Sequence, residues 1–308
     1  MMADEPTTLS RVGSFVSSAA SVVAPLSVLT ALLFYFGYAS SRAQYEYFGI
    51  DVDTIGLSTQ DYVMRSPQSL LTPLLGFLVL GVAGATVHEA VRRRIEATRA
   101  GVRDADNATA ARARARLERW RRVAGVLGAL GWVLLVAGVL LVLAYGVLQD
   151  WPPYALVTPV LMGVGAALAL YGHGLARLVD PEDRARRPAT LPLALVLAAS
   201  VFWVTATLAQ WSGRGAAHDA AKDMDGFPSV ILDTKERLHL TSPGIEESAL
   251  EPFPGSTFLY RYRNFRLLIE GDDRLFLVPP RWTPSNSTLV VPMDGAVRLQ
   301  FRFQNDPP

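Results

Sequence analysis

Long uncharged runs of apolar residues dominate the first two thirds of the chain. Each of the five runs is 19 to 27 residues long, which reaches the roughly 20 residues that an α-helix needs to cross a hydrocarbon core. A chain of 308 residues has too little polar sequence to cover five such helices in water. The pattern therefore predicts a membrane α-helical bundle of five transmembrane helices within residues 1–212, with spans at 15–39, 69–87, 123–149, 151–176 and 190–212.

The first run is either a retained transmembrane helix or a cleaved signal peptide. Its flank carries Asp4, Glu5 and Arg11 rather than a clear basic cluster. Its apolar stretch exceeds the core of a signal peptide, which is about 7–15 residues long. We therefore expect this helix to be retained.

Small residues four positions apart occur in several spans. Such pairs let the backbones of membrane helices approach closely. We therefore expect close helix packing, within a compact bundle or a dimer, at the pairs Gly81/Ala85, Gly125/Ala129 and Gly163/Ala167.

Arginine is distributed unevenly among the connecting segments. Residues 88–122 carry 11 arginines and residues 177–189 carry four, whereas residues 40–68 carry two. Cytoplasmic loops of membrane proteins hold the excess of Arg and Lys. We therefore expect the N-terminus in the cytoplasm, an Arg-rich cytoplasmic hairpin at 88–122, an outer loop at 40–68, and the C-terminal domain outside the cytoplasmic membrane.

The last third of the chain alternates apolar and polar residues. Val297, Leu299, Phe301 and Phe303 alternate with polar residues, which is typical of a strand with one buried face. The other candidate strands are 230–232, 237–240, 257–263, 265–270, 274–278 and 289–291, with a hairpin turn at 271–273 and a short helix considered only at 245–250. The sequence thus predicts a linker at 213–227 and a C-terminal all-β extracytoplasmic domain at 228–308, with six or seven strands in a small barrel or sandwich.

Composition narrows the chemistry. The formal net charge is +1, which argues against a nucleic-acid partner. The chain has no cysteine, which excludes disulfides, thiolate metal sites and cysteine nucleophiles. The sequence contains no recognisable catalytic, nucleotide-binding or metal-ligand motif. We therefore predict no enzymatic activity, no cofactor and no metal site.

One ionisable residue falls inside a predicted span. His173 lies in Gly172-His173-Gly174 near the inner end of the fourth run, and an ionisable group in a membrane is a functional candidate by default. Arg177 follows about one helical turn later, so the alternative is a histidine at the membrane interface with no special role. No Asp, Glu, Lys or Arg lies at mid-depth in any span, which weakens the case for an ion-coupled transporter.

The Arg-rich segment 88–122 is expected to form a solvated helical hairpin at the membrane surface. Each basic residue near anionic lipid contributes about 1 kcal/mol of attraction. Docking of a protein or a nucleic acid is the alternative, because basic content alone is unspecific. The predicted membrane-surface residues are Arg92, Arg93, Arg94, Arg112, Arg114, Arg116, Arg119, Arg121 and Arg122.

The outer loop combines aromatic and acidic residues. Tyr45, Tyr47 and Phe48 precede Asp51 and Asp53. Two aspartates are an incomplete ligand set for a cation. We expect the loop to act as an aromatic cap that lies on the membrane and supports the outer domain.

Four stretches carry a resemblance to known sequences: Phe34–Tyr38, Tyr47–Asp51, Arg65–Pro67, and the tail segment from Tyr260 through Pro279. They resemble uncharacterised multi-pass membrane proteins of high-GC actinobacteria. The resemblance implies a bacterial source and a membrane location. It implies no activity and no site.

These observations leave three classes of function. The leading hypothesis is a non-enzymatic integral membrane protein whose outer β domain binds a ligand, an envelope component or a partner protein, in sensing or assembly. The alternative is a subunit of a transporter or channel, because its spans contain Pro and Gly; a membrane enzyme comes third. The expected partners are the lipid bilayer, anionic lipids on the cytoplasmic side, and a protein partner or further copies of the chain.

Overall fold

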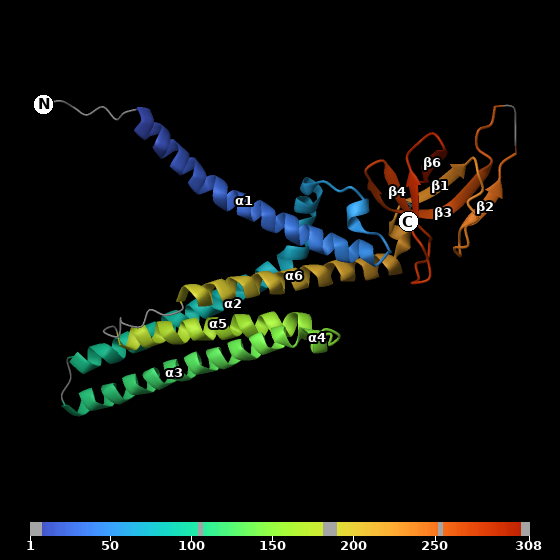
Figure 1. Cartoon of the computed structure of the whole chain (residues 1–308). Helices are drawn as coiled ribbons and strands as arrows, with labels where there is room; N and C mark the ends of the chain where they lie inside the picture. The colour runs from blue at the N-terminus through green and yellow to red at the C-terminus, as the bar shows by residue number, and fades with distance from the viewer. Residues whose placement is uncertain (1–7, 104–106, 181–189, 252–254, 303–308) are drawn as a thin grey trace, which may run out of the picture. The chain divides into compact units, whose positions relative to one another are not determined.

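The computed structural model describes residues 8–103, 107–180, 190–251 and 255–302 (Figure 1). Side chains are described for residues 25–101, 110–180, 190–251 and 255–302. Contacts divide the chain into two compact units. We call Met1–Leu70 together with Ala209–Pro308 the sheet unit, and Leu71–Leu208 the helical unit.

Four helices in the described part of the chain are long and apolar enough to cross a membrane. They are α2 (Thr59–Arg103), α3 (Asn107–Leu143), α5 (Tyr154–Val179) and α6 (Thr190–Lys222). They account for four of the five predicted spans. The first predicted span, 15–39, lies in α1 (Thr8–Glu46), where side chains up to residue 24 are outside the described set. A fifth span therefore stays a prediction.

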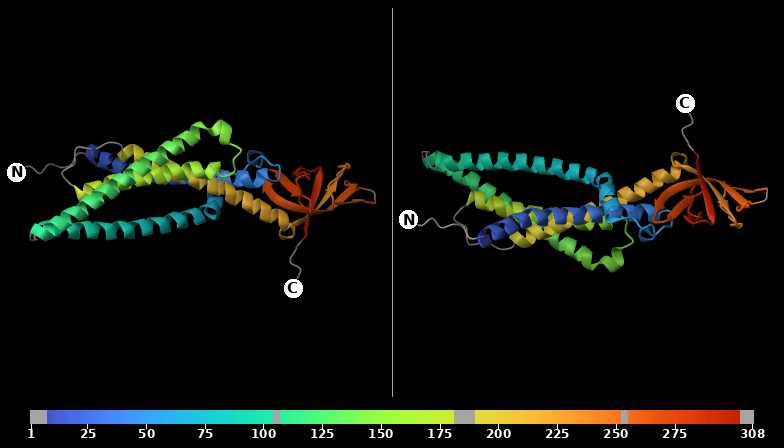
Figure 2. Two further views of the ribbon diagram at one scale, coloured as in Figure 1. Left: turned by 90° about the horizontal axis from the view of Figure 1, so that it is seen from below. Right: turned by 90° about the horizontal axis from the view of Figure 1, so that it is seen from above.

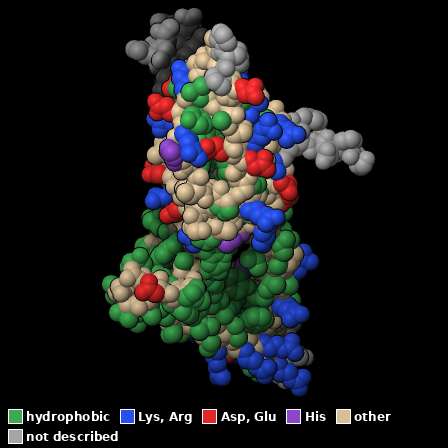
Figure 3. Space-filling view, turned by 90° about the vertical axis from the view of Figure 1, so that its right-hand side faces the viewer, with side chains coloured by type: hydrophobic (Ala, Val, Ile, Leu, Met, Phe, Trp, Pro, Cys, Tyr) green, Lys and Arg blue, Asp and Glu red, His purple; other side chains and the backbone are tan. Residues whose placement is uncertain are grey.

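Apolar side chains cover the outside of these helices. Leu80, Val133 and Leu191 are 68%, 64% and 70% exposed. Figure 3 shows hydrophobic side chains gathered into a continuous area over the helices, while Arg, Lys, Asp and Glu are mixed over the part that carries the strands. An apolar surface of this extent is unfavourable in water and is what lipid tails solvate. The helices are those of a multi-pass membrane protein.

Helices extend beyond the predicted spans at two places. α6 continues to Lys222, so residues 213–222 of the predicted linker are helical, and the 3-10 helix η2 (Met224–Gly226) follows. This segment is rich in alanine, the strongest helix former, and Ala217 is fully buried. α1 likewise runs to Glu46 and α2 begins at Thr59, so the predicted loop 40–68 shortens to 47–58 and contains the 3-10 helix η1 (Val52–Thr54).

The third predicted span is interrupted. α3 ends at Leu143, and the short helix α4 (Tyr145–Leu148) follows within the run that was expected to continue to residue 149. Pro153 then stands at the N-cap of α5. Proline is readily accommodated at a helix start, because the first backbone N–H groups have no partner within the helix.

Within the helical unit, α3 and α5 cross as close neighbours (Figure 2). A Cβ on Gly131 would lie 2.5 Å from the backbone nitrogen of Ala169, and one on Gly172 would lie 2.7 Å from that of Gly128. Only glycine allows this approach. No described atom lies within 4 Å of such a Cβ on Gly125, so the pair Gly125/Ala129 does not bring α3 against α5, and its packing in a dimer stays a prediction.

Six strands form one antiparallel sheet in the order β5-β4-β3-β1-β6, with β2 also paired to β3. β2 pairs with the first part of β3 and β4 with its last part. β5 and β6 stand at opposite ends of the order, and among the described residues they do not pair with each other. The domain is therefore an open sheet rather than the predicted barrel or sandwich. Its strands are β1 (Ser229–Thr234), β2 (Glu246–Ala249), β3 (Tyr260–Gly271), β4 (Arg274–Val278), β5 (Leu289–Pro292) and β6 (Val297–Arg302).

The strand predictions are confirmed in most places and wrong in three. The hairpin is confirmed, since Gly271 pairs with Arg274 across the turn. Residues 237–240 lie outside any strand, and 245–250 contains β2 instead of a helix. The two strands expected at 257–263 and 265–270 are a single strand, which a bulge bends near Asn264, a residue in the left-handed region with φ 72°.

Both faces of the sheet are covered near β4. Leu275 and Leu277 pack with Val230 and Leu232 of β1. Phe276 and Val278 point to the opposite face, where a second core contains residues from α1, η1, α2 and α6. β4 is therefore a continuous apolar run instead of an alternating one.

Candidate functional site

The nine predicted membrane-surface arginines lie on α2 and α3, and all nine are exposed. Arg92 and Arg93 pair with glutamates one turn away on α2, each at 2.8 Å. The other seven have no ion pair with a described residue. Ile95, on the same helix, is buried beside Ala124 of α3 and Leu175 of α5. The apolar side of the α2–α3 hairpin thus packs inward and leaves the arginines outside.

His173 lies on α5 and is half-buried. Its Nδ1 lies 2.6 Å from the carbonyl oxygen of Ala169, one turn earlier. A carbonyl oxygen can only accept a hydrogen bond, so the contact is a hydrogen bond in the tautomer that carries the proton on Nδ1. The second ring nitrogen, Nε2, forms no hydrogen bond with a described residue. It is the atom through which this side chain can contact a ligand.

A groove of about 410 Å³ between α3 and α5 brings His173 together with charged residues. Arg121 contributes from α3, and Arg177 and Asp180 from the end of α5. Of the nine predicted arginines only Arg121 lines this groove. Arg177 was predicted only to lie near the membrane interface, and its place in one groove with Arg121 was not predicted. No local signal in the sequence reports which residues of two distant helices face each other.

The floor of the groove is made of small residues, among them Gly125 and Gly128. Trp132 is the last residue of α3 that lines the groove. Arg121, Gly125, Gly128 and Trp132 follow the i, i+4, i+7, i+11 spacing of one helix face. With a rise of 1.5 Å per residue, the lining reaches about 16 Å along α3 from the arginine level.

This arrangement suits anion binding better than catalysis. Two guanidinium groups and an imidazole offer hydrogen-bond donors for phosphate or carboxylate oxygens. Neither Arg121 nor Arg177 forms an ion pair with a described residue. Within the described part of the chain, no three His, Asp or Glu residues are grouped to hold a metal ion.

In the sheet unit, the outer loop packs against the strands as predicted. Phe48, Val52 and Ile55 are buried in one core with Phe276 of β4. The backbone N–H of Asp272 donates to the carbonyl of Ile55 at 3.0 Å. The loop therefore supports the β domain; that it also lies on the membrane stays a prediction.

The two aspartates of this loop have structural partners. An oxygen of Asp51 accepts a hydrogen bond from the backbone N–H of Asp53 at 3.2 Å and so caps η1. The hydroxyl of Tyr38 donates to Asp53 at 3.2 Å. These contacts explain the acidic residues without a cation.

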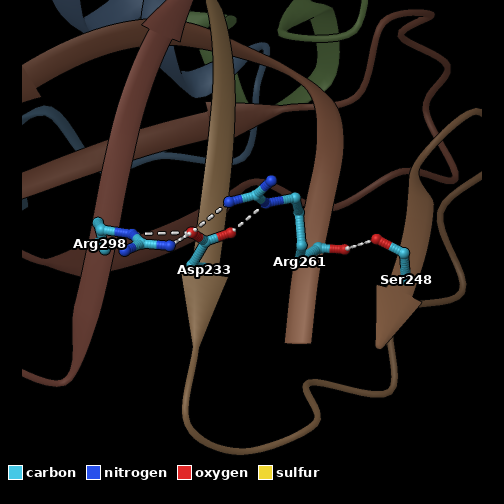
Figure 4. Close-up of polar contacts among 4 residues, drawn as sticks. All are labelled: Asp233, Ser248, Arg261 and Arg298. Carbon is cyan, nitrogen blue, oxygen red and sulfur yellow. Dashed lines mark hydrogen bonds and ion pairs between the residues drawn. The ribbon is translucent and has the colours of Figure 1, made fainter. Parts of the chain in front are cut away.

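A buried carboxylate that the sequence analysis missed lies in the sheet. Figure 4 shows Asp233 of β1 between Arg261 of β3 and Arg298 of β6. Arg261 donates to both carboxylate oxygens, at 2.7 and 3.0 Å, and Arg298 donates to Oδ2 through Nε at 2.9 Å. Asp233 is opposite each arginine in the strand register. The one feature of the sequence that could have indicated this carboxylate is an acidic residue directly after the apolar strand Val230–Leu232.

The electrostatics of this triad favour the ionised carboxylate. Burial raises the pKa of Asp233, but the hydrogen bonds and charges of Arg261 and Arg298 outweigh it and hold the pKa below its ordinary value. The Asp233 side chain is fully buried, whereas those of Arg261 and Arg298 are 22% and 47% exposed. The triad fixes the register of three strands and leaves one positive charge at the surface.

The end strands of the sheet carry exposed apolar side chains. Phe301 of β6 is 56% exposed, and Val290 of β5 is 45% exposed. β6 pairs with β1 on one side only within the described residues. Its other edge presents backbone groups that a further strand can pair with.

Comparisons with protein-family models, with curated protein sequences and with solved structures found no match to this chain.

Proposed function

We propose that the chain is a five-span protein of a bacterial cytoplasmic membrane whose β domain lies outside and binds a partner protein or an envelope component, in sensing or assembly. The N-terminus and the Arg-rich α2–α3 hairpin then lie in the cytoplasm. The concentration of arginine on that hairpin supports this orientation. The proposed role is non-enzymatic.

The shared core of the sheet unit carries this proposal. Tyr45 of α1 and Ala217 of α6 are buried in the same cluster as Ile269 and Phe276 of the sheet. The β domain therefore packs against the ends of α1 and α6 instead of being joined to them only by a flexible linker. A partner that shifts the strands has to shift these helix ends as well, because packed cores transmit displacement instead of absorbing it.

The β6 edge is the best candidate for the binding surface. Its open side offers backbone donors and acceptors for an added strand, and Phe301 offers an apolar contact. Binding by strand addition needs no catalytic group.

Photo-crosslinking in intact cells tests the proposal. A photoreactive residue replaces Phe301 in one variant of the full-length chain, and Lys235, an exposed residue after β1, in a matched control. We expect a specific adduct from position 301 and none from position 235. Equal adducts from both positions, or none from position 301, would contradict the proposal.

One observation favours the transporter alternative. The hydroxyl of Thr158 in α5 is buried and has no hydrogen-bond partner among the described residues. Ser200, Thr205 and Thr207 of α6 are also buried hydroxyl residues. Hydroxyl groups can bind ions or solutes within a membrane. Solute flux into proteoliposomes above that of empty vesicles would support this alternative, and flux equal to theirs would count against it.

A further inference from the structure

The groove between α3 and α5 has a charged end and an apolar end. α3 and α5 are consecutive membrane-spanning helices of opposite direction, so the beginning of α3 meets the end of α5. Arg121 and Arg177 therefore stand at the same end, together with Asp180. Two arginines and one aspartate give this end a formal charge of +1, with His173 counted as neutral.

The other end is apolar and open. A Cβ on Gly125 would meet no described atom within 4 Å. Trp132 is 47% exposed at the far end of the lining. The groove thus leads from cationic side chains at the membrane interface toward the hydrocarbon region, and its small residues leave room for a narrow ligand.

We propose that this groove binds one anionic phospholipid. Its phosphate lies between the guanidinium groups of Arg121 and Arg177 and within reach of Nε2 of His173. One acyl chain lies over Gly125 and contacts Trp132. Charge complementarity at one end and apolar complementarity at the other select a lipid over a soluble anion.

This site is distinct from the general attraction of the basic hairpin to anionic membranes. That attraction depends on the number of arginines near the surface and not on their positions. A site with fixed geometry depends on Arg121 and Arg177 in particular. Exposed arginines outside the groove, such as Arg119 and Arg122, provide the matched comparison.

The test uses the full-length protein in detergent micelles, with retention of phosphatidylglycerol and phosphatidylcholine measured by native mass spectrometry. We expect the wild type to retain phosphatidylglycerol in preference to phosphatidylcholine. The double variant Arg121→Gln with Arg177→Gln should weaken that retention about tenfold or more, as expected for lost charge-assisted hydrogen bonds. Arg119→Gln with Arg122→Gln removes the same charge and should change it little.

A second pair of variants tests the groove without changing charge. Gly125→Leu places a side chain in the open groove and should abolish phosphatidylglycerol retention. Gly174→Leu makes the same change at a residue that does not line the groove and whose Cβ would meet no described atom within 4 Å. Phosphatidylglycerol retention should persist in this variant. Both variants should elute as folded protein in size-exclusion chromatography, which separates lost binding from lost folding.

Three results would overturn the proposal. Equal loss in both double-arginine variants would mean unspecific surface attraction. Displacement of the lipid by inorganic phosphate at similar concentration would mean an anion site that does not require a lipid. Unchanged lipid retention in Gly125→Leu, with a shift in the oligomeric state, would mean that the groove binds a second copy of the chain.

Discussion

Gly213 of α6 lies directly against the backbone of Ser40 in α1. A Cβ at position 213 would stand 2.0 Å from the carbonyl oxygen of Ser40, closer than any real contact permits. Both residues belong to the sheet unit. The two helices therefore touch backbone to backbone beneath the core that holds the β domain.

Gly213→Ala should destabilise the sheet unit. The added methyl group forces the two helices apart, and overpacking of this kind costs about 1–3 kcal/mol. Gly215→Ala is the control on the same helix, because a Cβ there meets no described atom within 4 Å; its better helix propensity should leave stability equal or slightly higher. Thermal unfolding of the purified full-length protein measures both. Equal midpoints in the two variants would contradict the close contact.

Shortening the buried side chain of Phe48 should loosen the sheet, which is distant in sequence but packs against this loop. Phe48 is 1% exposed and its ring lies edge-on to that of Trp282 at 5.1 Å. Phe48→Ala should cost about 3–5 kcal/mol, as for other buried phenylalanines. Phe301→Ala, at a residue that is 56% exposed, should cost much less. Limited proteolysis of the β domain reports the difference, and similar cleavage rates in both variants would refute the shared core.

Loss of the buried carboxylate should weaken the sheet. Removing one member of a buried ion pair costs about 3–5 kcal/mol. Because Arg261 and Arg298 are 22% and 47% exposed, we expect Asp233→Asn to fall at the lower end, about 3 kcal/mol. Asp219→Asn breaks a pair whose side chains are 82% and 77% exposed and should cost less than about 1 kcal/mol. Denaturant unfolding followed by tryptophan fluorescence compares the two variants. Equal losses would show that the triad contributes nothing beyond a surface pair.

The same carboxylate should make stability depend on pH. The pKa of Asp233 is lowered in the fold, so the unfolded chain binds its proton first as the pH falls. The contribution of Asp233 is complete above the unfolded pKa of about 3.9 and is lost as the pH drops from there through the folded pKa. Asp233→Asn should therefore show a shallower loss of stability in this acid range than the wild type. Parallel pH profiles for the two proteins would contradict the assignment.

Features that depend on local sequence were predictable, and features that depend on how distant segments meet were not. The uncharged run 69–87 and the turn at Gly271 carry their signal within a few residues, and the structure places a long apolar helix and a hairpin there. Gly125 and Gly131 both lie in the apolar run of α3, yet of the two only Gly131 lies against the backbone of α5, because the rotation of α3 about its axis decides which face meets its neighbour. The pairing of Arg121 with His173 in one groove was unpredictable for the same reason.

The β domain outside the membrane is the central claim, and reporter fusions test it most directly. Fusions after residues 60, 105, 185 and 250 should report outside, cytoplasm, cytoplasm and outside. A fusion at the N-terminus should report cytoplasm if α1 is a fifth span. A reporter that is active in the cytoplasm when fused after residue 250 would contradict the account, because the β domain could then not meet an envelope partner.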